Sequence, residues 1–505
     1  MNSILPRALI SAALNALKVV ASFVTGILIA RGLGVQDYGT LSFLIASFTS
    51  LRLLLDMGTS SAFFTFISKS SRSKRFFFYY ACWITIQFIV SLAFIILIAP
   101  DKWVETIWQG EERVTVVLAF IAIFGQQILW TAITQVAESQ RLTIRIHQMN
   151  FCIAVFHLLA IGLLLSSGGL SIEVVLIFIA IEFVVAAIYT SRYLGPFSAS
   201  GDTTFRDVFQ EYKQYCLPLV PFVWTSLISV FANRWLLQEF GGSSEQALYG
   251  IAVQFTTIAF LLLGPIFNIL WKEIAEANQQ NNFKKLYDVY SQARRVMFLL
   301  PACLAGFSLP WTSEIIASFL GTQYAAAVLP MKIMLVYGLW QSVGAINTNM
   351  LLALELTRAR TVIGLFFALV SLPLTYFMLA PSTSNLPGMD LGASGLALKM
   401  LLLIVINVNV SGYWIARVMN WTFDWRSQFI TTSTTFIVGF LCYYVLNHFS
   451  PYWISDLLTM SIGAAVYLML IGIICLKAPF FLGLRIADVT IIKNLALQFL
   501  RPKRP

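Results

Sequence analysis

The sequence is an almost unbroken series of long apolar segments. About 14 of them follow one another between residues 8 and 476, each close to the ~20 residues that a helix needs to cross a bilayer. The chain is 58% hydrophobic and only 11% charged, whereas soluble domains carry about 25% charged residues. We therefore expect an all-α polytopic membrane protein with about 12–14 transmembrane helices and no soluble domain.

The basic residues are distributed unevenly between the predicted loops. With a cytoplasmic N-terminus, 25 of the 33 Lys and Arg residues fall on the cytoplasmic side, 3 on the other side and 5 within spans. This asymmetry obeys the positive-inside rule and predicts that both termini are cytoplasmic. It also explains most of the formal charge of +10, so we expect no nucleic-acid partner. The tail at 501–505, RPKRP, is predicted to be another anchor, in contact with membrane lipids.

A weak internal repeat divides the chain. Tyr-Gly follows the first span at 38–39 and the seventh at 249–250, and Glu-x-x-Arg ends the fourth span at 138–141 and the tenth at 355–358. Such short matches also arise by chance, but their offsets of 211 and 217 residues agree closely. Six spans per unit is an even number, which predicts a parallel repeat about an axis along the membrane normal.

The repeat predicts four regions. They are an N-lobe of six spans at 1–194, a cytoplasmic linker at 195–214, a C-lobe of six spans at 215–415, and two further spans with a basic cytoplasmic tail at 416–505. The linker contains an amphipathic stretch at 205–215 that is expected to lie along the membrane interface. The sequence contains no nucleotide-binding or nucleophile motif and no metal-ligand spacing. We therefore expect a protein that is not an enzyme and holds no metal or other cofactor.

A polar stripe runs along the first span. Lys18 lies at its middle, and steps of three and four residues place it on one helix face with Ser11, Asn15, Ser22 and Thr25. A charge at the bilayer centre costs at least about 2.5–3.5 kcal/mol on insertion scales. The stripe therefore predicts a wet path through the membrane.

Other charges interrupt later spans. Arg52 and Asp56 lie four residues apart in the second span, so they either form a self-neutralised pair or face a cavity. Arg234, beside Asn233 in the seventh span, either lines the cavity or snorkels to the interface. Lys399 lies deep in the twelfth span, with Asn407 near its face.

The remaining polar residues within spans leave more alternatives open. Glu182 is alone in the sixth span and could couple transport to protons or pair with one of the cations. Lys332 and Glu314 could face either the cavity or the interface, and His157 is interpreted as a core histidine. Gln126 and Gln341 either line a cavity or hold helices together.

Cations outnumber anions within the spans. The five cations are Lys18, Arg52, Arg234, Lys332 and Lys399, and the three anions are Asp56, Glu182 and Glu314. The cations come from both repeat units, so a central cavity between two lobes would favour an anion. Arg and Lys suit phosphate in particular.

The chain resembles the Wzx-type polysaccharide flippases, which transport O-antigen and exopolysaccharide units. These belong to the MOP superfamily together with the MATE exporters and the MurJ lipid II flippase. The resemblance rests on four segments in order: ARGLGVQDYG at 30–39, LLLDMGTSSA at 53–62, FLGTQYAAAVLPMKIM at 319–334 and LGASGLALKMLLL at 391–403.

The resemblance implies two six-helix lobes in a V around a central cationic cavity that works by alternating access in the bacterial inner membrane. It implies a substrate made of an oligosaccharide on undecaprenyl pyrophosphate. Lys18 and Arg52 match the cationic cavity positions of the family, and Arg234 matches less closely. A polysaccharide polymerase and a chain-length regulator are candidate partners.

We therefore expect a flippase for lipid-linked oligosaccharides of O-antigen, lipopolysaccharide or another surface polysaccharide. Lys18, Arg52, Arg234 and Lys399 are expected to hold the pyrophosphate. The polar cavity lining is expected to comprise Asn15, Ser22, Gln126, Asn233, Gln341 and Asn407. Without a nucleotide site, energy would come from an H⁺ or Na⁺ gradient, with Asp56 and Glu182 as candidate couplers.

Three alternatives remain. A MATE-like cation-coupled exporter of drugs or small molecules should have a net anionic cavity, and a lipid II flippase is a close rival. A non-transporting membrane scaffold would leave the polar stripes without a function.

Overall fold

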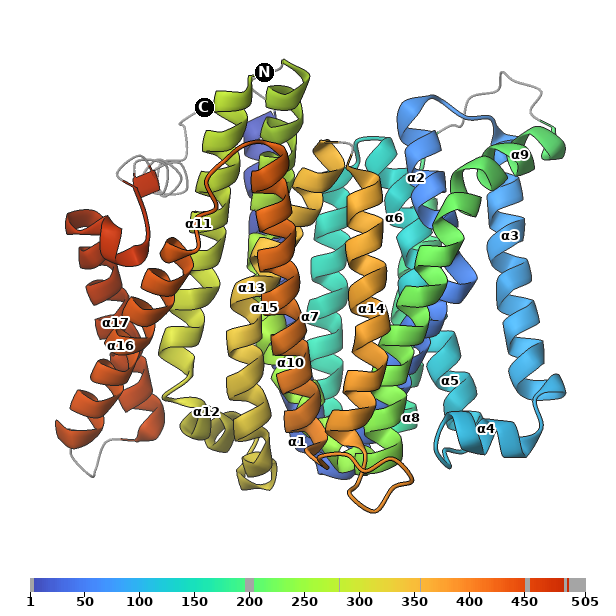
Figure 1. The fold of residues 1–505 in the computed structure, drawn as a ribbon. Helices are drawn as coiled ribbons and strands as arrows, with labels where there is room; N and C mark the ends of the chain where they lie inside the picture. Colours follow the sequence, from blue (N-terminus) through green and yellow to red (C-terminus); the bar gives the residue numbers. More distant parts are fainter. Residues whose placement is uncertain are drawn as a thin grey trace. The chain divides into compact units, whose positions relative to one another are not determined.

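The computed structural model describes residues 4–195, 204–280, 282–354, 356–449, 455–485 and 488–489. This part of the chain is helical and contains no β-strand (Figure 1). It forms two compact units: unit 1 comprises Met1–Ala247 and Ala368–Gly392, and unit 2 comprises Leu248–Phe367 and Ala393–Pro505. The linker centre at 196–203, Glu355 of the predicted repeat and the tail at 501–505 lie outside the described residues.

The length and apolarity of the helices are those of a multi-pass membrane protein. Among the described residues, 10 helices could cross a membrane, or up to 12 if each of two bent helix pairs is one span. The span Ala13–Asp56 counts once although it is 44 residues long. The 14-span count and the predicted lobe boundaries stay predictions.

The first helix of unit 1, α1 (Ile4–Asp56), reverses its direction at Gly34. This residue has φ 78° and ψ 178°, a conformation that a residue with a Cβ rarely adopts. The arm before it runs along α7 (Thr143–Ser167), where Gly32 lies against Leu165. The arm after it runs along α5 (Arg113–Phe124), where the rings of Phe48 and Phe120 lie 5.9 Å apart. The single long helix is therefore a hairpin of two arms.

A second reversal of the chain lies within unit 1, in α10 (Val220–Gln279), at Gly242 with φ 68° and ψ −172°. Arg234 Nη1 donates a hydrogen bond of 3.1 Å to Gln246 Oε1. In a straight helix, residues 12 apart would be about 18 Å apart, so this bond requires the chain to fold back. Gly34 and Gly242 occur at corresponding places in the two predicted repeat units, although the repeat itself stays a prediction.

The two reversals are in contact within unit 1. A Cβ added to Gly39 would lie 1.7 Å from the carbonyl oxygen of Ser243, so the backbones are in direct contact. The hydroxyl of Thr40 lies 3.0 Å from that of Ser243 and also donates to Glu111 Oε1 at 3.1 Å. Burial raises the pKa of Glu111, and the hydrogen bond from Thr40 opposes that shift. The contact therefore includes a carboxylate as well as close backbone packing.

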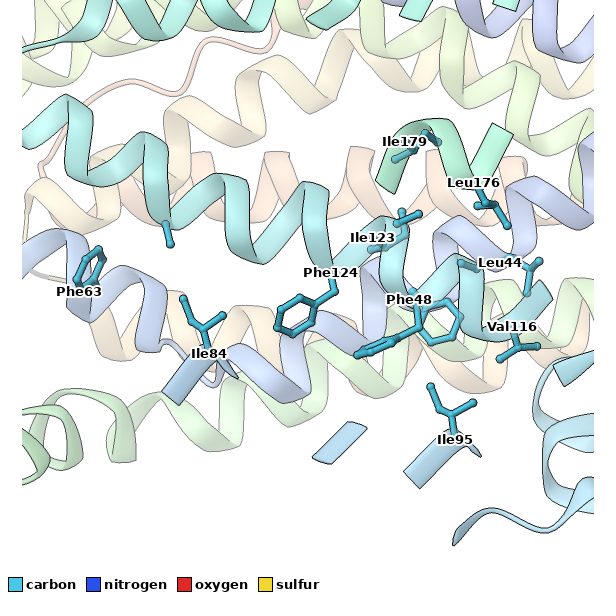
Figure 2. Close-up of a cluster of buried hydrophobic side chains, with 14 of the residues drawn as sticks. Leu44, Phe48, Phe63, Ile84, Ile95, Val116, Ile123, Phe124, Leu176 and Ile179 are labelled. Carbon is cyan, nitrogen blue, oxygen red and sulfur yellow. The ribbon is translucent and has the colours of Figure 1, made fainter. Parts of the chain in front are cut away.

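An apolar core holds the second arm of α1 in place (Figure 2). Leu44 and Phe48 of this arm pack with Val116 and Phe124 of α5 and with Leu176 of α8 (Ile172–Ser191). The other helices that begin in unit 1 are α2 (Thr59–Lys69), α3 (Lys74–Ala93), α4 (Asp101–Ile107), α6 (Trp130–Ser139) and α9 (Phe205–Cys216).

Unit 2 is built around α11 (Phe283–Ser308), which packs on α13 (Val328–Ala353) and α16 (Arg426–Phe449). A Cβ added to Gly439 of α16 would lie 1.9 Å from the carbonyl oxygen of Gly306 in α11. Small residues allow such close helix packing in membranes. The other helices that end in unit 2, or join it to unit 1, are α12 (Thr312–Phe319), α14 (Thr357–Leu379), α15 (Gly392–Val418) and α17 (Asp456–Lys477).

Replacing Gly439 with Ala should lower the unfolding temperature of the purified protein, because the methyl group must separate α16 from α11. Gly162 of α7 is the matched control, since a Cβ there meets nothing within 4 Å. Ala is about 0.8–1 kcal/mol better than Gly inside a helix, so Gly162→Ala should leave the unfolding temperature unchanged or raise it. Equal unfolding temperatures for the two variants would show that the α11–α16 contact is not tight.

Candidate functional site

A cavity of about 440 Å³ lies inside unit 1. We call it the unit 1 cavity. It is bounded by the first arm of α1, by the junction of α5 and α6, and by α7 and α8. Its polar lining consists of Lys18, Ser22, Thr25, Gln126, Gln127, Asn150, His157 and Glu182. A cavity that gathers this many polar side chains among apolar helices is a candidate site for a hydrophilic ligand.

The predicted stripe of the first span supplies one wall. Lys18, Ser22 and Thr25 line the cavity in the order that their spacing predicts. Asn15 lies on the same helix face but is half-buried outside the lining. Lys18 is half-buried and forms no hydrogen bond or ion pair with the described residues. Its ammonium group is therefore available to a ligand.

The wall formed by α7 and α8 carries a carboxylate–imidazole pair. His157 Nδ1 of α7 lies 2.9 Å from the carboxylate of Glu182 on α8. The Glu182 side chain is only 3% exposed and that of His157 is 16% exposed. Burying an isolated charge is costly, so the imidazole is what makes this carboxylate tolerable. The pair can share, accept or release a proton inside the cavity.

The glutamines reach the cavity from a π-helical turn. Residues Gly125–Leu129 form this turn, η2, between α5 and α6. The extra residue in such a turn changes the direction of the side chains, and π-bulges are frequent at functional sites. Gln127 Nε2 donates to Thr49 Oγ1 at 2.9 Å, and Trp130 Nε1 donates to Asn150 Oδ1 at 3.0 Å. Two of the amides are thus held by neighbouring helices.

The charges of the second span lie on the other arm of α1. Asp56 Oδ1 accepts hydrogen bonds from the hydroxyl of Thr59 at 3.2 Å and from the backbone N–H of Ser60 at 2.7 Å. A carboxylate at the first turn of a helix stabilises that helix, so Asp56 has a structural role at the start of α2. Arg52 is half-buried, and its Nε is buried without a hydrogen-bond partner.

The other predicted site residues are placed elsewhere. In unit 1, Arg234 bonds Gln246 near the α10 reversal, and Asn233 accepts a hydrogen bond of 2.8 Å from Thr375. In unit 2, Lys399 is fully buried, with Nζ 3.9 Å from the sulfur of Met400. Gln341 and Asn407 are half-buried in unit 2. The structure thus brings together Lys18, Ser22, Gln126 and Glu182 in the unit 1 cavity. That Lys18 shares one cationic cavity with Arg52, Arg234 and Lys399 stays a prediction.

Three residues of the lining are not predicted to be there by the sequence. The sequence places His157 in the core, whereas in the structure it lines the cavity and bonds Glu182. Asn150 lies seven residues before it, which places both on one face of α7. This spacing is a signal for a polar face. Trp130 gives no such signal, since its role depends on contact with Asn150.

No protein-family model matches the sequence, and no curated protein matches it either. Solved structures are similar in fold. The lipid II flippase MurJ in an inward closed conformation superposes with a TM-score of 0.69 and 15% identity, covering 92% of this chain and 98% of MurJ.

An inward-facing multidrug resistance MATE transporter of the MOP superfamily superposes with a TM-score of 0.55 and 14% identity. The match covers 82% of this chain and 98% of the transporter's chain. A MOP superfamily transporter from Pyrococcus furiosus, described as having a binding pocket of reverse polarity, has a TM-score of 0.56 and 13% identity, with 82% and 95% covered. At these identities the similarity establishes the fold, which this chain shares with transporters and flippases.

Substitutions of His157 and Glu182 should have strongly non-additive effects on the free energy of unfolding. His157→Leu leaves a buried carboxylate without its partner, and adding Glu182→Gln should recover part of the loss. Hydrogen bonds to charged groups contribute about 1.5–3 kcal/mol. We therefore expect a coupling energy of that size from the unfolding free energies of the two single variants, the double variant and the unchanged protein.

The neutral hydrogen bond in the same cavity provides the control. Trp130→Phe and Asn150→Leu should show a coupling of only about 0.5–1.5 kcal/mol. If the His157 and Glu182 effects instead add within about 0.3–0.5 kcal/mol, the pair is not energetically coupled.

Proposed function

We propose that the protein is a flippase that moves an oligosaccharide linked to undecaprenyl pyrophosphate across the bacterial inner membrane by alternating access. The observation that carries this proposal is the half-buried Lys18 in the unit 1 cavity of a fold shared with MurJ. The resemblance to Wzx-type flippases supports the choice of substrate, and the product would feed the synthesis of O-antigen or another surface polysaccharide.

The electrostatics of the cavity fit an anionic headgroup. Moving a pyrophosphate into a membrane without a cation is prohibitive, and Lys18 offers an ammonium group that no described residue neutralises. Amides and hydroxyls, including those of Gln126 and Ser22, can bond sugar hydroxyls. In this proposal Arg52, Arg234 and Lys399 contact the pyrophosphate at other stages of the transport cycle.

The rival functions share the fold. A lipid II flippase fits the structure equally well, because its substrate also carries a pyrophosphate on a polyprenyl chain. A MATE-like exporter of cationic drugs fits less well, since Lys18 faces the cavity while Glu182 is already paired with His157. The lipid intermediates that accumulate without the protein distinguish these alternatives.

A bacterial strain that lacks the protein should accumulate complete, unpolymerised oligosaccharide on undecaprenyl pyrophosphate, measured by mass spectrometry of its lipid extract. Returning Lys18→Gln should not relieve the accumulation, because the ammonium group is missing. Returning Lys102→Gln, which removes an exposed cation in α4, should relieve it fully.

Each other outcome points to a different function. Accumulation of lipid II alone would identify a peptidoglycan-precursor flippase. An unchanged lipid pool would exclude both flippase functions and favour drug export, which drug sensitivity of the strain would then test. Full function of Lys18→Gln at normal protein level would remove Lys18 from the substrate site.

We further propose that an H⁺ or Na⁺ gradient drives the cycle and that Glu182, paired with His157, is the coupling group. Glu182→Gln keeps the size of the side chain but cannot ionise. We expect its transport in proteoliposomes to lose its response to an imposed ion gradient, while Glu105→Gln, at an exposed carboxylate, keeps it. If Glu182→Gln responds normally and Asp56→Asn does not, the coupling group is Asp56.

A further inference from the structure

Helix α9 (Phe205–Cys216) has two different faces. Its inner face packs on other helices of unit 1. On this face Val208 and Cys216 are buried, and the Tyr212 ring lies 5.2 Å from that of Phe66. The helix begins with a capping box, in which Thr204 and Asp207 bond each other in both directions. The amphipathic helix predicted in the linker is therefore well formed and firmly attached along one side.

The other face is an exposed stripe. Steps of three and one place its members on one face of the helix and of the turn that follows it. Each is exposed: Arg206, Phe209, Gln210, Lys213, Gln214 and Leu217. We call this set the α9 stripe. The same residues, with Pro218, line a hollow of about 400 Å³.

The charge of the α9 stripe is purely positive. Its two cations, Arg206 and Lys213, are seven residues apart, or about 10.5 Å along the helix. The nearby carboxylates are engaged elsewhere: Glu211 forms an ion pair with Arg72 at 2.6 Å, and Asp207 accepts from Thr204 at 2.7 Å. The cations are thus left to attract an external anion.

We propose that the α9 stripe binds the headgroup of an anionic phospholipid of the surrounding bilayer. Arg206 and Lys213 contact the phosphate, and Phe209 and Leu217 enter the boundary between headgroups and acyl chains. Exposed aromatic and aliphatic side chains between cations are typical of helices that lie in a membrane interface. Anionic lipid attracts basic residues near the membrane surface.

Two further observations favour a lipid over a soluble anion. A soluble anion would leave Phe209 and Leu217 exposed to water, whereas a phospholipid covers them. The stretch Phe205–Leu219 is bent by 57° from the segment Val223–Ile258 that follows it in α10. A helix that bends away from the chain that follows it is suited to contact the surface of the bilayer.

Photo-crosslinking tests this proposal directly. The full-length protein is reconstituted in phosphatidylcholine vesicles that contain a photoactivatable phosphatidylglycerol or, separately, a photoactivatable phosphatidylcholine. Peptide mapping should place several-fold more phosphatidylglycerol than phosphatidylcholine on residues 204–219. In Arg206→Gln/Lys213→Gln this excess should disappear, and Arg206→Lys/Lys213→Arg should retain it.

The matched control is Lys69→Gln/Lys74→Gln, which removes two exposed cations from neighbouring helices and should keep the excess. Equal labelling by both lipids, or an excess that survives in Arg206→Gln/Lys213→Gln, would overturn the proposal. Displacement of phosphatidylglycerol by an equimolar amount of undecaprenyl phosphate would also overturn it, because the stripe would then be a polyprenyl-carrier site. Because the inference concerns bilayer lipid, it does not depend on the proposed transport function.

Discussion

The reversal of the chain at Gly34 is the constraint on which the arrangement of unit 1 depends. A φ of 78° is accessible to glycine at little cost, and it divides one helix of 53 residues into two arms. The first arm places Lys18 in the unit 1 cavity beside α7, and the second places Arg52 and Asp56 beside other helices. The hairpin also brings Gly39 and Thr40 to Ser243, where the backbones are too close for any side chain at Gly39.

Three charges inside unit 1 are accommodated in three different ways: one stabilises a helix start, one is paired and one faces a cavity. Asp56 stabilises the start of α2, Glu182 is paired with His157, and Lys18 faces the unit 1 cavity. Buried ionic groups rarely improve stability over apolar residues of similar size. Lys18 and the His157–Glu182 pair therefore lower the stability that an apolar core would provide, which points to a role in function.

Local features of the site could be predicted from the sequence, and features that depend on tertiary pairing could not. The three-and-four spacing of Lys18, Ser22 and Thr25 predicted a shared polar face, and that face lines the unit 1 cavity. The bond between His157 and Glu182 joins residues 25 apart on two helices. The sequence pattern within either helix therefore does not reveal it. The π-helical turn at Gly125–Leu129 has no sequence signature, and Asp56 became a cap only because α2 begins three residues later.

The proximity of a cation and a proton-sharing pair in one cavity has a thermodynamic consequence. If an anion binds at Lys18, a proton on the His157–Glu182 pair makes the local potential more positive and strengthens that binding. By linkage, the bound anion must then favour protonation of the pair by the same factor. A substrate with a pyrophosphate would thus change the protonation of the pair directly, with no need for a conformational signal between two distant sites.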